Sequence, residues 1–241
     1  MLRIFAISLV AAVAGNLASA QDTVRLATEG AYPPYNFIND SGEIDGFERI
    51  LGDELCKRAG LNCVWVANDW DSIIPNLQSA NYDAIIAAMS ITDERDAIID
   101  FSIPYLKPEP SSFVALAGSG PEVVGETVAV QVSTIFSGYV STSGATMLEF
   151  ATADEAVAAV RNGEAQATMD YRSRLEPIVA ESGGELAFVG ADVFLGDGVG
   201  MGFRSSDGAL RERFNDAIQS MKDDGSLNAM IAKWLGEGRA F

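Results

Sequence analysis

The sequence predicts an α/β fold divided into two similar lobes. Strand-like and helical segments alternate along almost the whole chain, which favours mostly parallel sheets covered by helices. A short helix, a tight turn and a buried strand occur at residues 71–89 and again at 152–169, once in each half. Between these halves, residues 103–110 contain three prolines and are expected to form an extended connector.

Residues 1–20 have the order of a secretory signal peptide. A positive start ends at Arg3, residues 4–14 are almost continuously apolar, and residues 18–20 (ASA) supply the small side chains of a cleavage site. The apolar run is shorter than the roughly 20 residues of a membrane-spanning helix. We therefore expect cleavage before Gln21 and a mature protein in the periplasm.

The elements expected in the first half start directly after this segment. They are a strand at 24–28, a helix at 47–59, a strand at 63–66, a short helix at 71–79 and a buried strand at 83–89. Cys56 stands near the end of the long helix, and Cys63 opens the next strand. In an oxidising compartment this pair is expected to form a disulfide, because a metal or redox site would need more ligands or a C-x-x-C spacing.

The elements expected in the second half repeat the same plan, and the tail adds a strand and two helices. They are a strand at 128–132, a helix from a Thr152–Glu155 capping box to Gly163, a strand at 165–169, a strand at 200–203, a helix at 208–223 and a last helix that ends near 236. If the tail packs on the first lobe, the backbone crosses between the lobes twice, which makes a hinge and a cleft. The expected first lobe is then 21–106 with 197–241, and the second lobe is 107–196.

Charge and composition exclude several classes of function. The chain carries 34 acidic against 16 basic residues, a net charge of −18, and such a surface repels nucleic acid. Histidine is absent, so neither a Ser-His-Asp nor a Cys-His catalytic set can form. We expect no metal cluster and no cofactor, and the protein is expected to act as a monomer.

A binding site is expected where the strands end, because ligands of open α/β sheets lie beyond the carboxyl ends of the strands. Arg95 offers a planar fork of donors for a carboxylate, with the Ser90 hydroxyl beside it. Asp170 suits an ammonium group, so the set describes a receptor for a zwitterion. The predicted ligand-binding residues are Glu29, Tyr32, Trp70, Ala88, Ser90, Arg95, Ser133, Thr134 and Asp170.

The other residues of this set point to the rest of the ligand. Backbone N–H groups of Ser133 and Thr134, at an expected helix N-terminus, would form an anion site. Tyr32 and Trp70 could enclose an apolar stem or a flat cation, and Glu29 could hold a distal positive group. Taken singly, Arg95 could be a solvated helix residue, Asp170 a helix cap and Trp70 part of the core. Their convergence on strand ends favours the binding site.

Two stretches resemble the periplasmic binding proteins of polar amino-acid ABC importers, solute-binding protein family 3, which bind lysine/arginine/ornithine, histidine, glutamine or opines. They are residues 23–35 (TVRLATEGAYPPY) and 83–95 (DAIIAAMSITDER). Shorter matches are residues 46–48 (GFE), 69–71 (DWD) and 196–198 (GDG), and the cysteine pair adds to them. The resemblance covers the whole mature chain, with the basic amino-acid and opine branch most similar.

This resemblance implies a hinged, two-lobed fold of the type II periplasmic-binding-protein class and delivery of the ligand to an inner-membrane ABC permease. It implies that Arg95 clamps the α-carboxylate of a free amino acid, Ser90 bonds the ligand backbone and Asp170 binds the α-ammonium. The position of Glu29 is acidic in binders of basic side chains, and aromatic residues at the positions of Tyr32 and Trp70 flank the side chain. The implied ligand is cationic: lysine, arginine or ornithine.

Departures from the family pattern keep two alternatives open. Residues 87–88 are alanines where basic amino-acid binders commonly have a serine pair, and Ile135 and Phe136 are apolar where polar contacts often lie. A wider, less polar pocket could take an opine or another polar amino acid. Cyclohexadienyl dehydratases use the same fold with an acidic general acid/base, a role open to Glu29, but a pocket of aromatic and acidic groups suits a flexible cation better. A receptor input module is disfavoured, since no transmembrane or kinase segment follows.

Overall fold

A computed structural model describes residues 23–120 and 122–241, so the expected signal peptide at 1–20 lies outside the described residues. The first half contains β1 (Thr23–Thr28), β2 (Ala31–Tyr32), β3 (Asn36–Ile38), β4 (Ile44–Asp45), α1 (Phe47–Arg58), β5 (Asn62–Ala67), a 3-10 turn (Trp70–Ser72), α2 (Ile73–Gln78), β6 (Ala84–Ile85), α3 (Asp93–Asp96) and β7 (Asp100–Phe101). In the part of the chain that is described, no helix is long and apolar enough to cross a membrane.

The second half and the tail follow in the same alternating order. They contain β8 (Pro110–Leu116), β9 (Thr127–Gln131), α4 (Ile135–Thr142), β10 (Thr146–Phe150), α5 (Ala153–Arg161), β11 (Ala167–Tyr171), α6 (Arg172–Glu181), β12 (Leu186–Phe194), β13 (Gly202–Phe203), α7 (Gly208–Asp223) and α8 (Ser226–Leu235), with 3-10 turns at Ser205–Asp207 and Glu237–Arg239.

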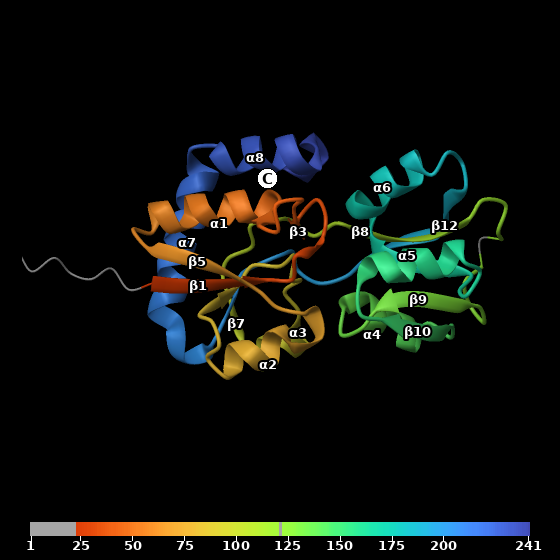
Figure 1. The fold of residues 1–241 in the computed structure, drawn as a ribbon, viewed down its shortest axis with the longest axis horizontal. Helices are drawn as coiled ribbons and strands as arrows, with labels where there is room; N and C mark the ends of the chain where they lie inside the picture. The colour runs from red at the N-terminus through yellow and green to blue at the C-terminus, as the bar shows by residue number, and fades with distance from the viewer. Residues whose placement is uncertain (1–22, 121) are drawn as a thin grey trace, which may run out of the picture.

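Two five-stranded sheets form the centres of the two bodies seen in Figure 1. The first has the order β5-β1-β6-β13-β7, and β1 runs parallel to β5 and to β6. The second has the order β10-β9-β11-β8-β12, with β9 parallel to β10 and β11, and β8 antiparallel to β11 and β12. Because β13 belongs to the first sheet, the chain crosses between the sheets twice, as predicted.

The two crossings lie side by side and are bonded to each other. The Tyr105 amide donates to the Val199 carbonyl at 2.9 Å, and the Val199 amide donates to the Leu106 carbonyl at 3.0 Å. Gly198 has a φ of +106° at this point, and a Cβ there would lie 2.6 Å from the Leu106 carbonyl oxygen. Glycine is therefore required where the strands of the hinge approach most closely.

The C-terminal tail packs on the first half. Helix α1 contacts both α7 and α8, and Figure 1 shows α8 running over α1 on one side of the first sheet, with α2 on the other. Leu51 and Leu55 of α1, Phe214 of α7 and Ile231 of α8 are fully buried and belong to one hydrophobic cluster. Their helical spacing produces the apolar face that the sheet covers.

Two strand predictions need correction, and further strands were not predicted. The strand expected at 83–89 is ordered only over Ala84–Ile85, because Ala88 has a φ of +49° and cannot continue a strand. The strand expected at 165–169 lies at Ala167–Tyr171, so Asp170 is inside it rather than after it. Strands β8, β10 and β12 of the second sheet were not among the predicted elements. Continuous apolar runs alone do not mark the ends of a buried strand.

Cys56 and Cys63 form the predicted disulfide. Their Cα atoms are 6.2 Å apart, and the bond joins the last turn of α1 to the second residue of β5. It closes a loop of about seven residues, so that the end of the helix and the start of the strand cannot separate in the unfolded chain.

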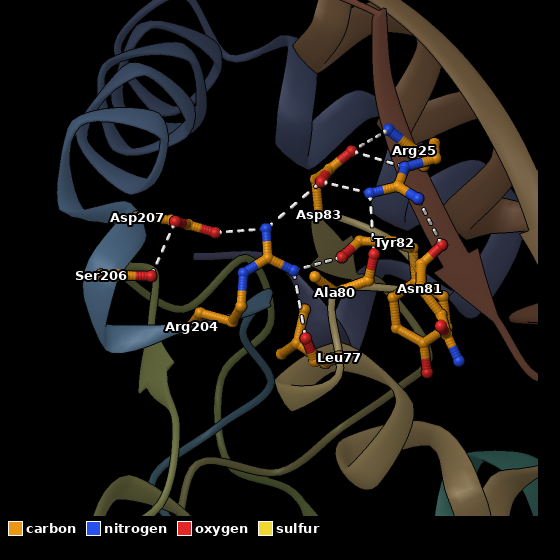
Figure 2. Close-up of polar contacts among 9 residues, drawn as sticks. All are labelled: Arg25, Leu77, Ala80, Asn81, Tyr82, Asp83, Arg204, Ser206 and Asp207. Atoms are coloured by element: carbon orange, nitrogen blue, oxygen red, sulfur yellow. Dashed lines mark hydrogen bonds and ion pairs between the residues drawn. The ribbon is translucent and has the colours of Figure 1, made fainter.

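A cluster of charges lies at the amino ends of β1 and β6. This Asp83 cluster (Arg25, Asp83, Arg204 and Asp207) ties the segment after β13 to β1 (Figure 2). Asp83 accepts from the Arg25 backbone amide at 2.9 Å and from its guanidinium at 2.8 and 3.0 Å. Arg204, which directly follows β13, donates to Asp83 at 3.2 Å and to the Leu77 carbonyl at 3.1 Å. One carboxylate thus joins β1, the turn before β6 and the return strand.

Candidate ligand-binding site

A pocket lies between the carboxyl ends of β1 and β6 and those of β9 and β11. Its walls come from both halves of the chain, which is the position expected for a ligand of open α/β sheets. The lining residues are Glu29, Tyr32, Trp70, Ala87, Ala88, Ser90 and Arg95 from the first half, and Gln131, Thr134, Ile135, Phe136 and Tyr171 from the second.

Arg95 is buried in this wall and is not a solvated helix residue. Its side chain is in the short helix α3, which Thr92 caps by accepting from the Arg95 amide at 3.2 Å. The guanidinium donates to the carbonyls of Ser90 at 3.0 Å and Ser133 at 3.1 Å. Burial lowers the pKa of Arg95. The ordinary pKa of arginine is so high that the group nevertheless stays charged. Two of its five N–H donors are thus used, and the remainder can receive a carboxylate.

Glu29 lies at the end of β1 and is bonded across the pocket. The Gln131 side-chain amide donates to the Glu29 carboxylate at 2.6 Å and to the Ala151 carbonyl at 3.0 Å. Burial raises the pKa of Glu29 to about 7, although the bond from Gln131 opposes this shift. A carboxylate that is poised near neutral pH gains strongly from a cation placed beside it.

The two aromatic residues of the predicted enclosure both contact the opposite half. Trp70 is 8% exposed, its indole N–H donates to the Ser133 carbonyl at 3.3 Å, and its ring lies 5.4 Å from the Arg95 guanidinium carbon. The Tyr32 hydroxyl donates to the Asp170 carboxylate. Both rings line the pocket, so they remain candidates for flanking a flat or apolar ligand group.

Ser90 and Ala88 line the pocket at the irregular end of β6. The Ser90 hydroxyl is hydrogen-bonded to the Tyr171 hydroxyl of the other half. The Ala88 amide donates at 2.6 Å to Glu48, a fully buried carboxylate that also accepts from the Asn36 side chain and the Tyr105 hydroxyl. These bonds hold the segment after β6 in the bent conformation that delivers Ser90 to the cleft.

Asp170 departs from the expected arrangement. It is buried inside β11 and does not line the pocket. One oxygen accepts from the Tyr32 hydroxyl and from the Tyr171 amide at 2.7 Å, and the other accepts from Arg174 at 2.9 Å. An ionised carboxylate has about four acceptor positions, so one is left. The strand was expected at 165–169 but lies at Ala167–Tyr171, so its last residue is Tyr171 and not a residue before Asp170.

The anion site expected from the Ser133 and Thr134 amides stays a prediction, although the Thr134 amide has a partner within the protein. Thr134 caps α4, and its amide N–H donates to the Ser137 hydroxyl at 3.2 Å, within the capping box of that helix. Ser133 does not line the pocket, and its carbonyl is the acceptor for Arg95 and Trp70. The Thr134 amide is thus paired within the capping box, and the Ser133 carbonyl adds an acceptor beside Arg95.

Sequence reasoning missed two polar residues of the wall, Gln131 and Tyr171. Each is the last residue of its strand, β9 and β11 respectively. The strand-end rule was therefore correct, and the errors of one or two residues in the strand boundaries concealed them.

Comparison with known proteins decides the family. The model of the bacterial extracellular solute-binding proteins, family 3, matches residues 24–237. This chain belongs to that family. Within the family, the chain is 31% identical to the lysine/arginine/ornithine-binding periplasmic protein of Escherichia coli (strain K12), over 92% of this chain and 91% of that protein. It is 30% identical to the octopine-binding periplasmic protein of Rhizobium meliloti, over 92% and 93%.

A solved family 3 structure is more similar still. It is a periplasmic His/Glu/Gln/Arg/opine family-binding protein from Silicibacter pomeroyi in complex with lysine, with 66% identity and a TM-score of 0.88. The match covers 90% of this chain and 99% of that one. The fold predicted from the sequence, two lobes of the type II periplasmic-binding-protein class, is confirmed by this similarity.

Proposed function

We propose that this protein binds a free basic amino acid, lysine, arginine or ornithine, and presents it to an ABC permease in the inner membrane. The two lobes, 21–106 with 197–241 and 107–196, close on the ligand by bending at the paired crossings. The protein is secreted to the periplasm after removal of residues 1–20 and acts there as a monomer. The relatives named above, which are periplasmic binding proteins, support this location.

The presence of Arg95 and Glu29 in the walls of one pocket carries the proposal. A free amino acid with a basic side chain has a carboxylate at one end and a cation at the other, and the pocket offers a buried guanidinium and a carboxylate to match. A buried carboxylate without a cation is costly, and neutral amino acids would leave Glu29 in that state. The lysine complex of the Silicibacter pomeroyi protein favours the same class of ligand.

The remaining residues take the roles that the contacts permit. Ser90 bonds the ligand backbone, and Tyr32 and Trp70 flank the side chain. Asp170 receives the α-ammonium group at its remaining acceptor position or in exchange for the Tyr32 hydroxyl. Ala88 and Thr134 supply surface around these groups, and the Ser133 carbonyl accepts from Arg95 and Trp70 beside them.

An opine is the second candidate ligand. The apolar wall of Ala87, Ala88, Ile135 and Phe136 gives no hydroxyl contacts to a small ligand, and octopine is the ligand named for one relative. An opine carries a second carboxylate, so it would need a second cationic partner. A dehydratase activity is disfavoured, since the family and the named relatives are solute-binding proteins.

Thermal denaturation with single ligands tests the proposal. Binding to the native state raises stability by RT ln(1 + [L]/Kd), so lysine, arginine or ornithine should raise the Tm most, and glutamine least. Octopine is included for the opine alternative, and arogenate and prephenate turnover for the enzyme alternative. A larger shift with glutamine than with any basic amino acid would contradict the proposed ligand class.

A further inference from the structure

Arg174 is the largest fully buried side chain in the described residues, yet it does not line the pocket. It lies in the first turn of α6, four residues after Asp170, and it donates to that carboxylate at 2.9 Å. Its other guanidinium nitrogen pairs with Asp154, an exposed residue of α5. A fully buried cation is costly unless it is paired. The Arg174 guanidinium and the Asp170 carboxylate therefore stabilise each other.

The same guanidinium also faces an aromatic ring of the other half. Its carbon atom lies 4.8 Å from the centre of the Tyr32 ring, and the Tyr32 hydroxyl donates to Asp170. Arg174, Asp170 and Tyr32 therefore form a closed three-membered contact that joins the two halves. Tyr32 lines the pocket, and Asp170 directly precedes the pocket residue Tyr171.

The charge of Arg174 acts on the ionisation of Asp170. Burial raises the pKa of Asp170, and the charge of Arg174 is the largest effect that opposes the shift. A protonated carboxyl cannot pair with an ammonium group, so the positive charge of Arg174 favours the form of Asp170 that can bind one.

We propose that Arg174 is a positioning residue for amino-acid binding, which holds the Asp170 carboxylate and the Tyr32 ring in place from behind the pocket. The inference rests on the proposed function for the identity of the ligand. Arg174 contacts Asp170, Asp154 and the Tyr32 ring, and these contacts restrict the positions of Asp170 and Tyr32. Groups that are already ordered lose less conformational freedom when a ligand binds.

The same helix supplies a matched control two residues away. Arg172 also pairs with two carboxylates, Glu176 and Asp192, and its guanidinium carbon lies 4.3 Å from the centre of the Phe188 ring. It makes the same kinds of contact as Arg174, but it is part-exposed and does not line the pocket. Arg172→Met therefore removes comparable interactions without touching Asp170 or Tyr32.

Calorimetric titration with lysine measures the effect on binding. We expect Arg174→Met, which keeps an unbranched buried side chain, to weaken lysine binding by about tenfold or more, and Arg172→Met to change it by less than about twofold. Arg174→Lys keeps the charge but loses the planar set of guanidinium donors. Its affinity for lysine should therefore lie between those of wild type and Arg174→Met. Equal losses at both arginines, or lysine binding by Arg174→Met within about twofold of wild type, would overturn the proposal.

The ionisation of Asp170 is measured in the unliganded protein by carboxyl NMR titration. The titratable groups around it are Tyr32, Tyr171, Arg174, Asp154 and Glu29, and the comparison uses the Glu29→Gln background because Glu29 titrates near neutral pH. We expect the pKa of Asp170 to be higher in Arg174→Met than in the protein that keeps Arg174, because the opposing positive charge is removed. An unchanged pKa overturns the positioning role. A protein that binds no amino acid but shows this shift refutes the proposed function alone.

Discussion

The charged residues at the pocket already have polar partners in the opposite half of the protein. Arg95 donates to the Ser133 carbonyl, and Glu29 accepts from the Gln131 amide. A ligand carboxylate or cation therefore joins or replaces existing hydrogen bonds. Its binding free energy is then a difference between two sets of contacts, and it depends on whether the ligand brings a full charge.

For Arg95, the change Arg95→Ala should weaken binding of a basic amino acid by about thirtyfold or more, because a bidentate, buried carboxylate pair is lost. Isothermal titration calorimetry measures it. Arg49→Ala is the control: Arg49 pairs with Asp53 and lies 5.3 Å from the Trp65 ring centre, but it is outside the pocket. Less than a fivefold loss at Arg95 would mean that the ligand carboxylate binds elsewhere.

For Glu29, affinity for lysine should rise with pH across the region of pH 7. Burial raises the pKa of Glu29 to about 7, and only the ionised form attracts the ligand cation. Binding then releases a proton, and affinity falls as the pH drops below the pKa, by at most about tenfold per pH unit. Glu29→Gln should lose this dependence and lose the preference for lysine over glutamine. A pH profile that is the same in both proteins would place the cation away from Glu29.

Glu29 also affects folding stability, with the opposite sign. Its pKa in the folded protein is raised from an ordinary 4.5 to about 7, so the folded state holds the proton more tightly. The resulting stabilisation is complete below the unfolded pKa and is lost as the pH rises through 7. A bound cation reverses this trend, because it favours the carboxylate.

At the level of secondary structure, the two ends of the first sheet are stabilised by different means. The pocket end depends on buried hydrogen bonds to Glu48, which hold Ala88 in its bent conformation. The other end depends on the Asp83 cluster, where two arginines from distant parts of the sequence share one carboxylate (Figure 2). The second arrangement is needed because β13 reaches the sheet only after the chain has built the other half.

For the Asp83 cluster, Asp83→Ala should lower the free energy of unfolding by about 1–3 kcal/mol, since Arg25 and Arg204 lose a shared acceptor. Asp216→Ala, an exposed acid of α7, is the control and should change stability by less than about 0.5 kcal/mol. Urea denaturation measures both. An Asp83 variant as stable as the control would show that packing alone holds β13.

The pH dependence of this cluster can be stated with its sign. Burial favours the protonated form of Asp83, but hydrogen bonds from Arg25 and Arg204 outweigh burial and hold its pKa below the ordinary range. The stabilisation is present above the unfolded pKa and is lost as the pH falls through the folded pKa. The difference in stability between wild type and Asp83→Ala should therefore shrink in acid.

In the whole molecule, the two bodies are joined by two adjacent crossings and by contacts across the pocket. Backbone hydrogen bonds of Tyr105, Leu106 and Val199 join the crossings to each other. Tyr105 also donates its hydroxyl to Glu48, whose other partners include the Ala88 amide at the pocket. The hinge and the cleft therefore share one buried carboxylate.

For the hinge, Gly198→Ala should lower stability by about 1–3 kcal/mol, because a Cβ would meet the Leu106 carbonyl and the residue has a positive φ. Gly138→Ala is the matched control: Gly138 lies in α4 with nothing within 4 Å of its built Cβ, and alanine favours a helix. Thermal denaturation of both variants measures the effect. A Gly198 variant with an unchanged Tm would show that the crossings separate readily.

The sequence by itself determined the two-lobed α/β plan, the disulfide, the tail that packs on the first half and most of the pocket residues. These follow from local signals: apolar periodicity, capping residues, cysteine spacing and the position of polar residues at strand ends. Glu29, Tyr32, Trp70 and Arg95 could be predicted because they converge on the carboxyl ends of strands, although none of them is decisive alone.

Only the tertiary structure decided which atoms these residues present to the cleft. Asp170 is paired with Arg174 and Tyr32, the Ser133 carbonyl faces Arg95, and Gln131 and Tyr171 complete the walls. These facts depend on a positive φ at Ala88, a one- or two-residue shift of strand ends and contacts between the halves, such as that of Tyr32 with Asp170, 138 positions apart. Hydrogen bonds between such distant groups leave no periodic trace in a sequence, because their partners are chosen when the two halves meet.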